Sequence, residues 1–228
     1  MINNPVNSGG VSMFYSILLS IHILAGSAAL IAAIIAAGLK TANLSHHWHR
    51  ISGLVFVAGM LLVFVTAVVM TMLKPNLFLL LIAIFSVYLA LTGWRMARNR
   101  RGDPGVVDWL LQGAMLLSAL MMLGLGALQL FNGMGQGITL LVFAGLSLWF
   151  SLSGLRTLRE GGFRGGERIA NHAGMMLGGT IATITAVLVV NVSLEPAFIL
   201  WLAPTVLITP LIIWWKYRLL SGVRVRGM

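Results

Sequence analysis

The residues best suited to chemistry in this chain are its five histidines, because they lie within or beside long apolar segments. Imidazole nitrogens ligate zinc, iron and copper, and they gain and lose protons near neutral pH. Ionisable side chains at membrane depth are costly, so each is a candidate for a functional role. His22 and His172 lie within apolar segments, and the other three are His46, His47 and His49.

Depth along a helix limits which histidines can share a ligand. At 1.5 Å per residue, His22 lies roughly 6 Å outside the midplane of its segment, and His172 lies roughly 13 Å inside the midplane of its own. Two histidines on one haem iron bring their ring nitrogens within about 4 Å of each other. His22 and His172 are therefore poor partners for one haem, whereas His172 and His49 can meet near the inner surface.

Two kinds of cofactor site follow from these positions. A haem b site would use His22, His49 or His172 as ligands. A divalent metal site at the inner rim would draw on a larger set, His46, His47, His49 and His172. Structural roles compete with both, since the run from His46 to Arg50 also suits an interfacial loop, and a buried histidine often bonds to a neighbouring helix.

No residue is predicted to be catalytic. The acidic residues nearest the apolar segments, Asp108 and Glu195, stand at segment ends, which argues against carboxylate-driven pumps. The sequence contains no Walker loop, serine elbow or His-Glu-x-x-His motif. It also contains no cysteine, which excludes disulfides and thiolate metal sites.

The elements that must position the histidines are membrane helices. The chain has 228 residues, of which 59% are hydrophobic and only 9% are charged, whereas a soluble domain carries about 25% charged residues. We expect a single all-α integral membrane domain over residues 1–228, a polytopic bundle of seven transmembrane helices. The predicted spans are approximately 12–39, 51–73, 77–95, 106–131, 137–156, 169–193 and 197–217.

The basic residues predict the orientation of these spans. All of the 15 Lys and Arg residues except Lys74 fall into four groups, at 40–50, 95–101, 156–168 and from 216 onward. Basic residues concentrate on the cytoplasmic side of membrane proteins, so the N-terminus is expected outside and the C-terminus inside. The formal charge of +10 then suits anionic lipid headgroups, and nucleic acid is not an expected partner.

The third and fifth spans resemble each other at a shift of 61 residues. The clearest correspondence is their shared ending, in which Gly93 and Arg95 match Gly154 and Arg156. The second and sixth spans agree at about twice that shift. We therefore expect one helix followed by three related helical hairpins, an arrangement that arises by duplication and occurs in transporters.

Several motifs give the chain a family resemblance over nearly its whole length. They are Ile21–Leu30, His49–Gly53, Lys74–Leu80, Tyr88–Arg95, Asn171–Gly178 and Ile181–Ala186. On these motifs the chain resembles an uncharacterised family of bacterial multi-pass membrane proteins that forms a domain of unknown function. The resemblance implies the fold and three histidine positions, His22, His49 and His172, and it brings no activity. Relatives carry Arg where this chain has Met175.

Three classes of function remain open. The first is a structural or accessory component of the bacterial inner membrane that packs against lipids and other membrane subunits. The second is an electron-transfer protein that binds haem b or a divalent metal through the histidines. The third is a small-solute transporter, which the parallel hairpins and scattered Ser and Thr side chains would suit.

Overall fold

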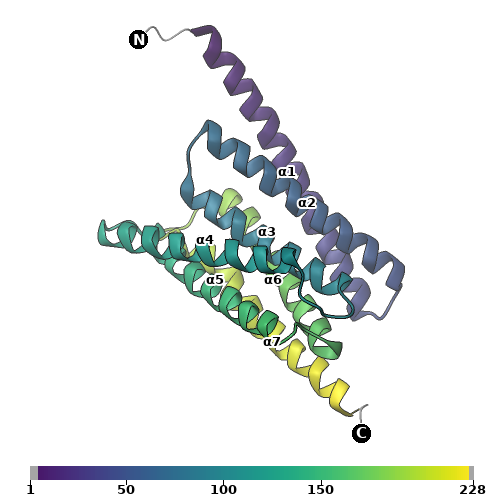
Figure 1. The fold of residues 1–228 in the computed structure, drawn as a ribbon. Helices are drawn as coiled ribbons and strands as arrows, with labels where there is room; N and C mark the ends of the chain where they lie inside the picture. Colours follow the sequence, from purple (N-terminus) through teal and green to yellow (C-terminus); the bar gives the residue numbers. More distant parts are fainter. Residues whose placement is uncertain (1–4, 226–228) are drawn as a thin grey trace. The chain divides into compact units, whose positions relative to one another are not determined.

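The computed structural model describes the backbone of residues 5–225 and the side chains of residues 12–217. Within that range the chain forms seven α-helices (Figure 1), and each contains a segment long and apolar enough to cross a membrane. The predictions of an all-α fold and of seven span-length helices are confirmed. The helices are α1 (Pro5–Thr41), α2 (His46–Leu73), α3 (Leu77–Arg98), α4 (Val106–Phe131), α5 (Gln136–Arg159), α6 (Gly165–Asn191) and α7 (Phe198–Val225).

Local sequence explains where several helices begin and end. At the start of α2, Ser45 accepts a hydrogen bond from the Trp48 backbone N–H at 3.4 Å, and Asn76 does the same for Leu79 at 3.0 Å before α3. These side chains satisfy N–H groups that have no partner inside the helix. Pro75 lies between the two helices, where its ring prevents α2 from continuing.

The chain divides into two compact units, Met1–Ala83 and Ile84–Met228. In the first unit, α1 and α2 form an antiparallel hairpin (Figure 1). Ala25, Ala29 and Ala33, which repeat every four residues on one face of α1, are buried, whereas Ala37 at the end of this series is half-buried. A Cβ atom placed on Gly59 would lie 2.9 Å from the Ala29 Cβ and 3.0 Å from the Ala25 carbonyl oxygen, so small residues set the distance between the helices.

In the second unit, α3 contacts three other helices. The ring of Phe85 meets that of Phe143 in α5 edge-on, with centroids 5.0 Å apart. The Tyr88 hydroxyl donates to Gln112 Oε1 in α4 at 2.9 Å. Arg168 of α6 donates to the Met96 carbonyl near the end of α3. Polar groups from α4 and α6 therefore contact the C-terminal half of α3.

The remaining helices pack in pairs, α4 with α5 and α6 with α7. Gly137 permits the first pairing, since a Cβ there would lie 2.6 Å from the Leu130 backbone nitrogen. The Gly174-x-x-x-Gly178 motif of α6 does not act as one contact surface. A Cβ on Gly178 would touch Leu89 at 3.5 Å, whereas one on Gly174 would meet no atom within 4 Å.

The basic residues of the C-terminal tail lie beyond the described side chains after Lys216. They are Arg218, Arg224 and Arg226. Their expected place at the inner surface stays a prediction, as do the orientation of the two termini and the single integral domain.

Candidate functional site

His22 joins the two helices of the first unit. Its Nδ1 lies 2.9 Å from the Thr66 hydroxyl oxygen, which also lies 2.8 and 2.9 Å from the carbonyl oxygens of Leu62 and Val63. The hydroxyl has one proton, so it either donates to a carbonyl and accepts from Nδ1–H of His22 or donates to Nδ1, according to the tautomer of the ring.

His49 joins the same two helices near their other end. Its Nδ1 lies 2.9 Å from the Ala36 carbonyl oxygen in α1, and a carbonyl oxygen can only accept. Ala36 follows His22 by 14 residues, which is roughly 21 Å along a helix axis. His22 and His49 therefore belong to separate sites, because two ligands of one metal ion must lie within about 4 Å of each other.

His172 makes the corresponding contact in the second unit. Its Nδ1 lies 2.8 Å from the Gly93 carbonyl oxygen in α3, so Nδ1 again donates. Gly93 allows α6 to approach this closely, since a Cβ there would lie 2.9 Å from the Met176 sulfur. The three histidines that the family resemblance singles out thus share one arrangement, in which Nδ1 is hydrogen-bonded to a neighbouring helix.

His46 and His47 lie on the exposed first turn of α2. The His46 ring is parallel to that of His49 at a centroid distance of 6.3 Å, and His47 meets Trp48 edge-on at 5.8 Å. Among the described residues, no group of three or more His, Cys, Asp or Glu side chains could hold a metal ion. The divalent metal site predicted from His46, His47, His49 and His172 stays a prediction.

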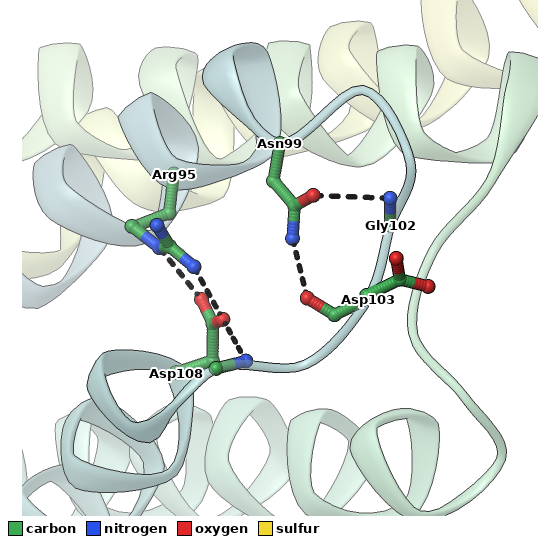
Figure 2. Close-up of polar contacts among 6 residues, drawn as sticks. Arg95, Asn99, Gly102, Asp103 and Asp108 are labelled. Carbon is green, nitrogen blue, oxygen red and sulfur yellow. Dashed lines mark hydrogen bonds and ion pairs between the residues drawn. The ribbon is translucent and has the colours of Figure 1, made fainter.

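An ion pair links the end of α3 to the start of α4 (Figure 2). Arg95 Nε donates to Asp108 Oδ1 at 2.9 Å, and Arg95 Nη2 donates to Asp108 Oδ2 at 2.6 Å. Asp108 Oδ2 also accepts from the Gly105 backbone N–H at 2.8 Å, which completes the first turn of α4. In the same loop, the Asn99 side chain donates to the Asp103 carbonyl and accepts from the Gly102 N–H.

Residues 1–102 match the model of a family of unknown function (DUF6040). Neither a curated protein nor a solved structure matches the chain. The predicted resemblance to an uncharacterised family is confirmed over these residues, which include His22, His49 and Arg95, whereas His172 lies outside the matched range.

Sequence reasoning missed the polar residues between α3, α4 and α6. Asp108 was predicted only to stand at a helix end, and Arg95 and Arg168 only to set orientation. A signal for the ion pair was present, since Arg95 and Asp108 lie on either side of one short loop and carry opposite charges. Arg168 gave no comparable signal, because the acceptors of its Nη1 are backbone carbonyls.

Proposed function

We propose that this chain is a multi-pass integral membrane protein that acts as a structural or accessory component, without catalysis of its own. The observation that supports this function is that His22, His49 and His172 each join a pair of helices through a hydrogen bond at Nδ1. Polar side chains that bond across membrane helices stabilise their association. In this proposal the histidines maintain the shape of the helical surface and do not carry a reaction.

The lipid bilayer and other membrane subunits are the proposed partners. Large apolar side chains face outward along the helices, among them Leu24, Leu117 and Val206, which are 70%, 62% and 67% exposed. Apolar surface of this extent needs lipid or protein to cover it. We place the chain in the bacterial inner membrane as one integral domain, with the N-terminus outside, the C-terminus inside, and α2–α7 as three related hairpins.

A haem b or metal protein that transfers electrons is the second candidate, and the histidine tautomers favour it. Histidines that ligate metals commonly donate their other ring N–H to a carbonyl, which fixes the ring and leaves one lone pair for the metal. His49 donates Nδ1–H to a backbone carbonyl in this way, and so does His172. A haem or a divalent metal bound by either histidine would supply the redox or Lewis-acid chemistry.

A small-solute transporter is the third candidate. The helices α4 and α5 bury the hydroxyls of Ser118 and Thr139, and neither has a hydrogen-bond partner among the described residues. Unpaired hydroxyls inside a membrane bundle suit a path for a polar solute. Uptake of a solute from a panel by reconstituted vesicles would support this candidate, and uptake of none would count against it.

Substitutions of His49 distinguish the structural role from the ligand role. Asparagine carries an amide N–H close to the position of Nδ1 and has no group at Nε2, whereas alanine has neither. We expect His49→Ala to destabilise the purified protein by about 0.5–1.5 kcal/mol through loss of one interhelical hydrogen bond. His49→Asn should keep most of that stability, and His47→Ala, at an exposed position, serves as the matched control for stability alone.

Absorption spectra of the same samples, oxidised and then reduced with dithionite, complete the test together with elemental analysis. The structural proposal predicts a featureless spectrum and no stoichiometric metal in the wild type. A Soret band that shifts on reduction, with iron that both His49 variants lose, would contradict it and establish the haem candidate.

A further inference from the structure

Two loops of the second unit pack against each other through glycines. They are the seven-residue loop between α3 and α4 and the five-residue loop between α5 and α6. A Cβ atom on Gly102 would collide with the Phe163 carbonyl oxygen, and one on Gly162 would collide with the Gly102 carbonyl oxygen. Glycine permits this close approach of two backbones because it has no Cβ. Residues 98–105 and 159–164 therefore form one surface, which we call the paired-loop surface.

The paired-loop surface carries an excess of positive charge. It contains five Arg, two acidic residues and no Lys, and all seven charged residues are exposed. Asp103 pairs with Arg164 across the two loops at 3.4 Å, and Glu160 pairs with Arg156. Among the described residues, the arginines of this surface that belong to no ion pair are Arg98, Arg100, Arg101 and Arg159. Four positive charges therefore remain without a carboxylate partner.

Orientation in the membrane alone does not explain why these basic residues are all arginine. Lys and Arg contribute alike to the charge bias that orients membrane helices, and the chain uses lysine in its other basic groups, at Lys40 and Lys216. A guanidinium presents parallel N–H donors that fit two oxygens of one phosphate or carboxylate, whereas an ammonium acts as a point charge. The use of arginine therefore favours recognition of an oxyanion by this surface.

The depth of the surface indicates which oxyanion it meets. The helices α3, α4, α5 and α6 are each long and apolar enough to cross a membrane, and the two loops are too short to extend far beyond their ends. The guanidinium carbon of Arg98 lies 5.4 Å from the centroid of the Trp94 ring, and Trp109 on the first turn of α4 is 40% exposed. Indoles prefer the headgroup region of a bilayer. The arginines therefore lie at the level of lipid phosphates.

We propose that the paired-loop surface is a binding site for the headgroup of an anionic phospholipid, whose phosphate oxygens accept hydrogen bonds from its exposed arginines. Basic surfaces between membrane helices on the cytoplasmic side bind such headgroups. A lipid held by both loops stabilises the second unit, because it adds a link between the α3–α4 and α5–α6 connections. The inference rests on the membrane location in the proposed function, and it is independent of the role of the histidines.

Thermal unfolding of the full chain in dodecyl maltoside, with increasing dioleoylphosphatidylglycerol, provides the test. We expect this anionic lipid to raise the Tm saturably and zwitterionic dioleoylphosphatidylcholine to raise it much less. The double variant Arg100→Gln/Arg101→Gln should need about 30-fold more phosphatidylglycerol for the half-maximal rise, as expected for the loss of two basic residues at an anionic surface. Arg100→Lys/Arg101→Lys keeps the charge but loses the bidentate geometry, and it should need about threefold more or above.

The matched control is Lys40→Gln/Arg50→Gln, which removes two charges from exposed positions of the first unit and should leave the half-maximal concentration unchanged. Equal rises with the two lipids, equal losses in the two glutamine variants, or a lysine variant that matches the wild type would each refute the site. Flotation with vesicles of each lipid after removal of detergent separates this failure from failure of the membrane location. A wild-type chain that enters neither kind of vesicle would contradict the membrane location, and the lipid site with it.

Discussion

At the residue scale, the contact between Arg95 and Asp108 combines several properties that make ion pairs strong. The geometry is bidentate, and the two side chains are only 27% and 15% exposed. The carboxylate also accepts from the Gly105 backbone N–H at the start of α4. Charge-assisted hydrogen bonds with this geometry are stronger than neutral ones, so the pair holds the α3–α4 connection in place.

The substitution Asp108→Asn removes the charge and one acceptor oxygen while it keeps the shape of the side chain. We expect it to destabilise the second unit by about 1–3 kcal/mol, measured as a lower Tm or a lower denaturant midpoint. The matched control is Glu160→Gln, which removes the carboxylate of the exposed pair with Arg156, whose side chains are 81% and 61% exposed. That change should leave the Tm unaltered, because exposed pairs contribute little. Equal effects of the two substitutions would contradict the special role of Asp108.

The types of the candidate residues could be predicted from the sequence, whereas their partners could not. His22, His49 and His172 are evident as polar groups beside apolar segments. The acceptors of His49 and His172 are backbone carbonyls of Ala36 and Gly93. Every residue carries a carbonyl, so no side-chain pattern marks the one that a histidine will bind.

At the element scale, the related spans show why sequence similarity predicts packing only in part. Gly93 in α3 and Gly154 in α5 occupy matching positions, and both allow another helix to approach closely. The approaching groups differ, since Gly93 meets Met176 of α6 and Gly154 meets Gln112 of α4. The repeat thus predicts where a small residue is needed, but it does not predict the neighbour that fills the space.

The seven helices themselves were predictable, because their number depends on hydropathy and on the short breaks between apolar segments. The residues at which the helices begin and end were less predictable. The first helix begins at Pro5, ahead of the expected span from about residue 12, since helix formation does not stop where the apolar run stops. Capping groups such as Ser45 and Asn76 decide such boundaries locally.

The hairpin of α1 and α2 makes a prediction about an element as a whole. In Gly59→Ala, the added Cβ would lie 2.9 Å from the Ala29 Cβ and 3.0 Å from a backbone oxygen of α1. We expect the helices to separate slightly and the first unit to lose about 1–3 kcal/mol, as is usual for overpacking.

Gly38→Ala provides the control within the same hairpin, because a Cβ there meets no atom within 4 Å. It should be neutral or slightly stabilising, since alanine favours a helix more than glycine does. Thermal unfolding of both variants measures the difference. Two neutral substitutions would show that the α1–α2 contact is looser than the structure indicates.

At the scale of the whole molecule, the distribution of basic residues relates the sequence to the membrane. The loops after α3 and α5 contain Arg100, Arg101 and Arg164, and Lys40 and Arg50 flank the loop after α1. The loops after α4 and α6 contain no Lys or Arg. Short loops with many basic residues stay in the cytoplasm during insertion. Because seven crossings alternate sides, this rule predicts the side of every loop.

The absence of cysteine from the chain allows this orientation to be measured without background. Single cysteines at Met134 and Ser193 should react with a membrane-impermeant maleimide in intact cells. Cysteines at Ala42, Arg101 and Glu160 should react only after the membrane is opened. All five positions are exposed, so a difference in labelling reports the side of the membrane and not burial. The reverse pattern would invert the topology, and the basic loops would then face outward, against the charge rule that predicts the opposite.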